Sequence, residues 1–271
     1  MLARINDIDV HYEEHGSGEP LLFIHGFPLT GALWRPALAK LPDGWHGIAP
    51  DLRGFGGTSL GREPVHTMEL FADDLVALLD HLGIERAVVC GLSMGGYIAF
   101  ALWRRARERV RALVLCDTRP AADSDEARHT RLLTATRART EGTGFLAREL
   151  LPRLLSPVSA RRPDIVARVE SMIADTAAEG IARASLGMAE RPDSTPWLVT
   201  MRVPALVVVG ADDAITPVGE VERLADDLPD AHLAVIVDAG HLAPLEQSAV
   251  FNHDLELFLE RIGAQVSGPR A

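Results

Sequence analysis

The sequence has few cysteines and no long apolar run. Its two cysteines in 271 residues, Cys90 and Cys116, both fall inside short apolar segments. Two thiols in such segments argue against a disulfide framework and favour a reducing compartment, so we expect a cytoplasmic protein. No stretch of about 18 apolar residues occurs, which argues against a transmembrane helix. The first residues also lack the apolar core of a signal peptide.

Positive charge is scarce as well. Lysine and arginine number 27 against 38 aspartates and glutamates, which gives a net charge of −11, and Lys40 is the single lysine. This balance argues against binding to nucleic acid or to an anionic membrane. The histidines are not spaced as metal ligands, and no cluster of His, Cys and Asp indicates a metal site. We therefore expect no metal, no cofactor and a small-molecule partner.

A serine stands between glycines where an apolar segment meets a helical one. Residues 91–96 read Gly-Leu-Ser-Met-Gly-Gly; they follow the apolar run 87–90 and precede a helix-like stretch. Gly-x-Ser-x-Gly at a strand-to-helix turn is typical of a nucleophile elbow. The glycines remove Cβ atoms that would collide with the neighbouring strand and helix. We predict that Ser93 is a nucleophile; the alternative is an ordinary glycine-rich turn.

A nucleophilic serine needs a base, and the base needs an acid that orients it. The apolar run 204–210 leads into Asp213, and the run 232–237 is soon followed by His241. In an open parallel sheet, functional groups gather at the carboxyl ends of the strands. The chain order Ser93, Asp213, His241 is the order expected for this type of elbow. We predict these three residues as the catalytic triad.

Other carboxylates near the predicted acid have alternative roles. Asp117 follows the apolar run 112–116 and could supply the acid, although such a residue more often caps a turn. Asp212 is expected to face solvent, because only one of two adjacent carboxylates can point at the histidine. We expect Thr216 to be the N-cap and Pro217 the first residue of the next helix.

An alkoxide formed on the attacked carbonyl needs preorganised N–H donors. The apolar run 21–24 ends in residues 25–28, His-Gly-Phe-Pro. We predict that the backbone N–H groups of Phe27 and Met94 form this oxyanion hole. His25 precedes the elbow in the chain, so we expect it to hydrogen-bond the loop rather than act as the base.

These motifs together resemble those of the α/β-hydrolase fold superfamily, most closely small bacterial carboxylesterases and 3-oxoadipate enol-lactonase-like enzymes. The resemblance implies an α/β fold with a mostly parallel eight-stranded sheet, flanking helices and a helical cap inserted after the sixth strand. A serine at position 93 disfavours the dehalogenase and epoxide hydrolase branches, and Ser248 stands where relatives often have proline. The matching segments are residues 25–28, 51–56, 91–96, 210–217 and 240–246.

The chain is expected to form one core domain, residues 1–117 and 197–271, interrupted by a cap at residues 118–196. In the core, strands alternate with helices, which predicts right-handed crossovers and a parallel sheet. The cap segment lacks the apolar runs that are typical of buried strands. A helical lid formed by this segment would cover Ser93 and exclude water. Four helical stretches are expected there, at residues 125–140, 144–155, 163–176 and 177–189.

Candidates for the substrate pocket are weaker than those for the triad. Met188 and Trp197 belong to the cap or its end, where packing between helices explains an apolar residue better than substrate contact does. Trp34, just after the oxyanion loop, is the better pocket candidate of the three. Three arginines of the cap could meet a substrate carboxylate or simply be solvated: Arg128, Arg131 and Arg183.

The sequence therefore predicts a serine hydrolase that cleaves a small carboxylic ester or lactone through an acyl-enzyme. Enol-lactone hydrolysis, C–C bond hydrolysis and perhydrolysis could use the same three residues. A non-catalytic ligand receptor built on the same fold is the alternative from a different class.

Overall fold

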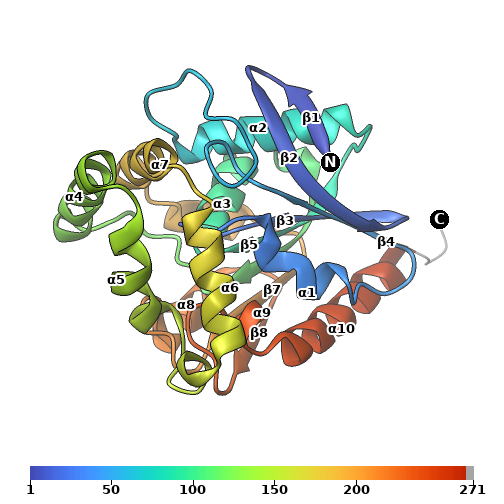
Figure 1. Cartoon of the computed structure of the whole chain (residues 1–271). Helices are drawn as coiled ribbons and strands as arrows, with labels where there is room; N and C mark the ends of the chain where they lie inside the picture. The colour runs from blue at the N-terminus through green and yellow to red at the C-terminus, as the bar shows by residue number, and fades with distance from the viewer. Residues whose placement is uncertain (267–271) are drawn as a thin grey trace.

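The computed structural model of the protein describes residues 1–266. Eight strands form one sheet in the order β1-β2-β4-β3-β5-β6-β7-β8 (Figure 1). All neighbours from β4 to β8 pair in parallel, whereas β2 pairs antiparallel with β1 and with β4. The strands are β1 (Leu2–Ile5), β2 (Ile8–Gly16), β3 (Glu19–Ile24), β4 (Trp45–Pro50), β5 (Ala87–Leu92), β6 (Val110–Cys116), β7 (Ala205–Gly210) and β8 (Ala231–Ile236). The mostly parallel eight-stranded sheet expected from the resemblance is confirmed.

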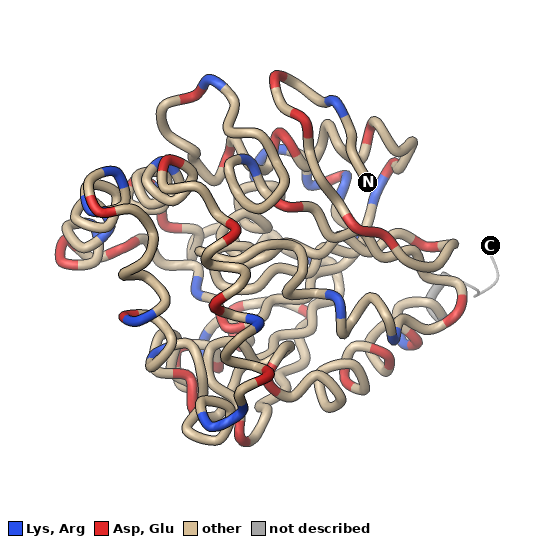
Figure 2. Tube along the Cα trace, viewed as in Figure 1, with Lys and Arg blue, Asp and Glu red and all other residues tan. Residues whose placement is uncertain are grey.

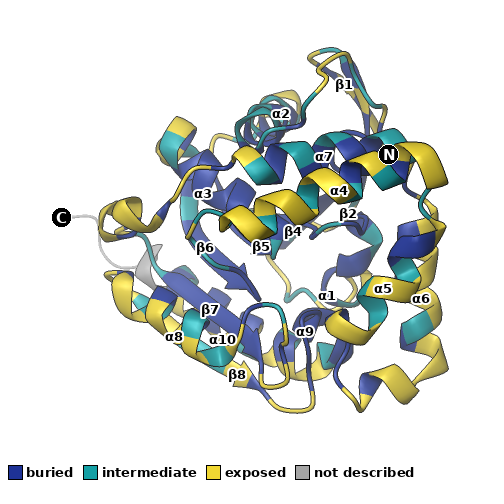
Figure 3. Cartoon of the chain, turned by 90° about the vertical axis from the view of Figure 1, so that its left-hand side faces the viewer, coloured by how far each residue is buried: buried dark blue, intermediate teal, exposed yellow. Residues whose placement is uncertain are grey.

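The burial of each strand follows its apolar pattern. Every residue of β5 and of β7 is buried, as expected for central strands with both faces covered. In β2 only alternate residues, Ile8, Val10 and Tyr12, face the interior. β1 and β2 form an antiparallel hairpin, with Ile5 opposite Ile8. Figure 3 shows β7 as a dark, buried strand, whereas the edge strand β8 is partly exposed.

Helices cover both faces of the sheet. α2 packs on α3 on one face, and α1 lies beside α10 on the other (Figure 1). Thr67 caps α2 by accepting a hydrogen bond from the amide of Leu70 at 3.1 Å. The core helices are α1 (Arg35–Leu38), α2 (Met68–His81), α3 (Met94–Ala106), α8 (Val218–Asp227), α9 (Ala243–Glu246) and α10 (Ser248–Val266).

Four helices lie between β6 and β7, and we call them the helical insertion. They are α4 (Asp125–Glu141), α5 (Gly144–Leu154), α6 (Pro163–Ala174) and α7 (Ala178–Glu190). α4 packs on α7 and α5 on α6, at the left of Figure 1. The insertion also contacts the core directly, because the amide of His66 donates to the carbonyl oxygen of Arg183 in α7 at 3.1 Å.

Charged residues of both signs are spread along the described trace (Figure 2). None of the helices within residues 1–266 has the length and apolar character needed to cross a membrane. Cys90 and Cys116 are buried free thiols on the neighbouring strands β5 and β6.

Candidate active site

Ser93 occupies the turn between β5 and α3. Its backbone has φ 52° and ψ −110°, a region that residues with a side chain rarely adopt. The turn also presses against β3, since a Cβ on Gly95 would lie 2.2 Å from the carbonyl oxygen of Ile24. Ser93 itself is only half-buried, so its hydroxyl can be reached from outside. The local geometry is that of a nucleophile elbow.

Two hydrogen bonds join the three residues that the sequence singles out. His241 Nε2 lies 2.8 Å from Ser93 Oγ, and His241 Nδ1 lies 2.8 Å from Asp213 Oδ2. With Nδ1–H donating to the carboxylate, Nε2 is free to accept the serine proton. His241 and Asp213 are both buried, being 2% and 6% exposed.

The carboxylate of Asp213 is held by the segment that follows it. Oδ1 accepts from the amides of Ile215 at 2.7 Å and Thr216 at 3.0 Å, and the hydroxyl of Thr216 donates to Oδ2. Burial alone would raise the pKa of Asp213, but the charge of His241 and these hydrogen bonds outweigh it and lower the pKa. The expectation for Thr216 is wrong: Pro217 is the N-cap of α8, because the threonine hydroxyl is bonded to Asp213 instead.

The two alternative carboxylates, Asp117 and Asp212, lie in surroundings that differ from those of Asp213. Asp117 is fully buried, with φ 46°, and its Oδ1 accepts from the amide of Gly210 at 2.8 Å. Its Oδ2 has no hydrogen-bond partner within the described residues. Burial, together with the charge of Asp213, raises the pKa of Asp117 well above its usual range. Asp212 is exposed, as expected.

The loop that carries Phe27 is fixed from both sides. The amide of Leu29 donates to the carbonyl oxygen of Gly26 at 2.9 Å, and the Phe27–Pro28 peptide bond is cis. His25 donates from Nδ1 to the same carbonyl oxygen at 3.0 Å and accepts at Nε2 from the amide of Leu52 at 3.0 Å. Burial lowers the pKa of His25, which keeps the ring neutral in this arrangement. His25 therefore bonds the loop and not the serine.

The N–H groups of Phe27 and Met94 are the candidate oxyanion donors. Neither has an acceptor elsewhere in residues 1–266. Met94 opens α3, where the first amides of a helix lack intrahelical partners and favour a negative charge. Both groups are therefore available to a ligand.

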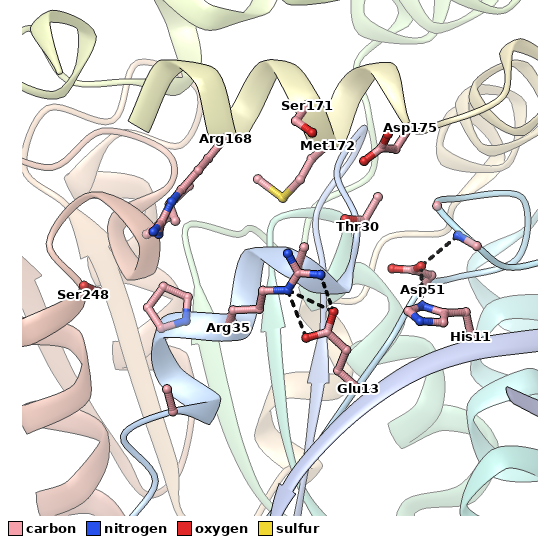
Figure 4. Close-up of a pocket in the computed structure, with 16 residues that line it drawn as sticks. His11, Glu13, Thr30, Arg35, Asp51, Arg168, Ser171, Met172, Asp175 and Ser248 are labelled. Carbon is pink, nitrogen blue, oxygen red and sulfur yellow. Dashed lines mark hydrogen bonds and ion pairs between the residues drawn. The ribbon is translucent and has the colours of Figure 1, made fainter. Parts of the chain in front are cut away.

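A groove of about 900 Å³ runs between α6 of the helical insertion and α1 of the core (Figure 4). On its floor Arg35 makes a bidentate ion pair with Glu13, the shortest distance being 2.6 Å. Arg168 and Met172 reach into it from α6 (Figure 4). The groove is lined by none of the three triad candidates, although Thr30 and Leu245 in its wall follow the oxyanion loop and His241 in the chain.

The three predicted pocket residues do not line this groove. Trp34 is fully buried, and its ring centroid lies 5.0 Å from that of Phe23 and 5.9 Å from that of Phe251. Met188 is buried in α7, and Trp197 is 45% exposed. Packing in the core accounts for the position of Trp34.

Two of the three candidate arginines have acidic partners in the structure. Arg131 pairs with Asp123 at 3.2 Å, and Arg183 pairs with Glu179 at 2.8 Å. Arg128 is exposed on α4.

Sequence reasoning missed the part that Glu246 plays in the site. Its carboxylate is buried and accepts from the amides of Gly240 and Leu242, on either side of His241. The one signal in the sequence is position, because Glu246 follows the histidine by five residues within a matching segment.

The fold and this site define a class of protein. A family model described as the alpha/beta hydrolase fold matches residues 19–248, and the chain belongs to that family. The fold and its hydrolase relatives support an enzyme that hydrolyses esters.

The chain is also similar over most of its length to individual hydrolases. A solved thermophilic esterase from Thermogutta terrifontis is 42% identical, covers 97% of this chain and 99% of its own, and superposes with a TM-score of 0.94. The enol-lactonase from Burkholderia xenovorans is 29% identical over 96% of this chain and 100% of its own, with a TM-score of 0.88. 3-Oxoadipate enol-lactonase 2 of Acinetobacter baylyi is 29% identical over 94% of both chains.

Proposed function

We propose that the protein is a carboxylesterase that cleaves small carboxylic esters through an acyl-enzyme on Ser93. One observation carries this proposal: two hydrogen bonds of 2.8 Å connect Ser93 Oγ to His241 and His241 to Asp213. Together they supply a nucleophile, a base and a group that fixes the tautomer of the base.

In the proposed reaction Ser93 Oγ attacks the ester carbonyl carbon while its proton passes to His241 Nε2. The imidazolium that forms is stabilised by Asp213, whose ionised state the lowered pKa supports. The tetrahedral intermediate collapses as the C–O bond to the alcohol breaks and His241 protonates the leaving oxygen. Water then enters, gives a proton to His241 and attacks the acyl carbonyl carbon. The second tetrahedral intermediate collapses as the bond to Ser93 Oγ breaks, His241 returns the proton to Oγ, and the acid is released.

The oxyanion of both tetrahedral intermediates would be bound by the amides of Phe27 and Met94. Neither amide has a competing acceptor in the described chain. Losing one such donor typically costs a hundredfold or more, roughly 3 kcal/mol, in other hydrolases. These two groups therefore complete the proposed machinery with no metal or cofactor.

We assign the helical insertion, within residues 118–196, the role of a cap over the core formed by residues 1–117 and 197–271. α7 is bonded to the core at His66, and the groove of Figure 4 opens between α6 and α1. A cap in this place would exclude water and limit the size of the acyl or alcohol group.

Lactone hydrolysis is a second candidate, favoured by the two relatives named as enol-lactonases. The chemistry at Ser93 is the same, except that the leaving oxygen is part of the acyl chain, so that deacylation releases a single hydroxy acid and no separate alcohol. The two activities differ in the shape of substrate that fits beneath the helical insertion.

The test is hydrolysis of p-nitrophenyl esters, from acetate to octanoate, by the wild type and by Ser93→Ala. We expect turnover by the wild type and a loss of several orders of magnitude in kcat for the variant. Comparable turnover by a folded Ser93→Ala protein would refute the serine mechanism.

A matched panel of simple lactones decides between the two substrate classes. A higher kcat/KM for lactones than for open esters of equal carbon number would favour the second candidate. Tight binding of both classes without turnover would indicate a receptor.

A further inference from the structure

The carboxylate of Glu246, at the end of α9, accepts three backbone N–H groups. Oε1 accepts from Gly240 at 2.9 Å and from Leu242 at 3.1 Å. Oε2 accepts from Ser156 at 2.8 Å, just beyond the end of α5. Among the described side chains no arginine or lysine pairs with this carboxylate, and the residue is 1% exposed. The three amides therefore stabilise its charge, through bonds of the stronger, charge-assisted kind.

The backbone of the catalytic histidine is bonded to the helical insertion as well. The amide of His241 donates to the carbonyl oxygen of Leu154, the last residue of α5, at 2.9 Å. The two backbones touch, since a Cβ on Gly240 would lie 2.6 Å from the nitrogen of Ser156. Three consecutive amides thus have fixed acceptors: the first and third bond Glu246, and the second bonds the insertion.

We propose that Glu246 is a positioning residue that couples the placement of His241 to the position of the helical insertion. The inference rests on the proposed function, because it requires His241 to be the base. The ring can meet Ser93 and Asp213 at once only if its backbone is fixed, and a misplacement of about 1 Å can cost about a hundredfold in rate.

This coupling determines when His241 is aligned with Ser93 and Asp213. If α5 moves outward to admit substrate, the bonds from His241 to Leu154 and from Ser156 to Glu246 break together. The histidine loop then keeps only the bonds to Glu246 from within the core. The base is aligned when the insertion is closed, so that closure over substrate completes the site.

The experiment replaces Glu246 with glutamine, which has the same size. A glutamine has one oxygen and one NH₂ group, so its NH₂ must face either the amide of Ser156 or those of Gly240 and Leu242. We expect kcat per titrated active site to fall by about 10- to 100-fold, with little change in KM. The acidic limb of the kcat/KM profile against pH should shift in the same variant.

A spectroscopic signal reports the alignment directly. The proton on His241 Nδ1, shared with Asp213, should give a downfield ¹H NMR resonance in the wild type. In Glu246→Gln this resonance should broaden or vanish, because the ring no longer keeps one position. Active sites are counted by titration with a p-nitrophenyl phosphonate, so that misfolded protein does not enter the rates.

Asp74→Asn is the matched control. Asp74 is also a buried carboxylate, bonded to Arg53 at 2.7 Å from α2, and has no contact with the triad candidates. The control should lose thermal stability but keep kcat per titrated site, the pH profile and the NMR resonance. Should Glu246→Gln fail to fold, Glu246→Asp serves instead; it keeps the charge, but its shorter side chain cannot bond the amides of Ser156 and Gly240 at once.

The outcomes separate cleanly. If Glu246→Gln, or Glu246→Asp in its place, matches Asp74→Asn in all three readouts, the glutamate is only structural and the proposal fails. A shifted pH limb with a lower kcat and a lost resonance supports it. Failure of the proposed function is seen elsewhere, in the wild type and in Ser93→Ala, before any variant of Glu246 is measured.

Discussion

His241 Nε2 lies 2.8 Å from Ser93 Oγ, although 148 residues separate the two in the chain. The sheet brings them together, because the serine follows β5 and the histidine follows β8, and the carboxyl ends of parallel strands meet at one edge. The acid arrives in the same way, after β7. Which carboxylate serves as that acid can be tested directly.

Asp213→Asn should lower kcat/KM by about 10⁴-fold, the loss seen when an amide holds a catalytic histidine in the wrong tautomer. Asp117→Asn should change it by less than about tenfold, because the carboxyl of Asp117 bonds the amide of Gly210 and not His241, and asparagine can accept the same bond. Steady-state kinetics on one p-nitrophenyl ester measures both. A larger loss in Asp117→Asn than in Asp213→Asn would transfer the role of acid to Asp117.

The tight turn at Ser93 leads to a second prediction, which concerns the stability of the folded protein. Gly95→Ala should destabilise the protein by about 3 kcal/mol or prevent folding, since the new Cβ would lie 2.2 Å from the carbonyl oxygen of Ile24 and neither backbone can give way. Gly144→Ala at the start of α5 is the control, because a Cβ there meets nothing within 4 Å. Urea midpoints of the two variants compare them. Equal midpoints would mean that the elbow is looser than its geometry implies.

The triad candidates and the helices of the insertion could be predicted from the sequence because the residues that indicate them lie close together in the chain. Glycines around Ser93 and apolar runs before each triad candidate lie within a few residues of the groups they position. The helices of the insertion begin within a residue of expectation for the same reason; α4, for example, spans Asp125–Glu141 against the expected 125–140.

Features made by distant segments could not be read in this way. Thr216 has the residue type of an N-cap, but its hydroxyl bonds Asp213 three residues earlier, and the distant His241 holds that carboxylate in place. Trp34 is a core residue because Phe251 of α10 covers it. The groove of Figure 4 exists only where α6 and α1 face each other. The cap boundaries, the pocket residues and the cytoplasmic location stay predictions.

Asp117 should make stability depend on pH. Because folding raises its pKa from the usual 3.8, the folded protein holds a proton that the unfolded chain releases. Stability therefore falls as pH rises between the two pKa values, by at most about 1.4 kcal/mol per pH unit. Asp117→Asn removes this loss, so its advantage over the wild type should be larger at pH 8 than at pH 5. Urea unfolding at both pH values measures it, and a constant difference would contradict the assignment.

His66 should act in the opposite direction. It is fully buried beside Phe71, with ring centroids 5.7 Å apart. Burial, aided by the charges of Arg53 and Arg183, lowers its pKa from 6.5 to about 4. At pH values between these two pKa values, the unfolded chain binds a proton at His66 and the folded protein does not. The wild type should therefore lose up to about 3 kcal/mol of stability through this one group as pH falls from 7 to 4.

His66→Gln isolates that contribution, because groups that titrate alike in both proteins cancel in the difference. At pH 7 the variant should be the less stable protein, since glutamine lacks the ring that packs on Phe71. The gap should narrow steadily as pH falls and can reverse near pH 4. A gap that stays constant would mean that water or a backbone carbonyl oxygen accommodates the charged ring. In that case His66, which bonds Arg183 through its backbone, would not make the contact between the core and α7 sensitive to acid.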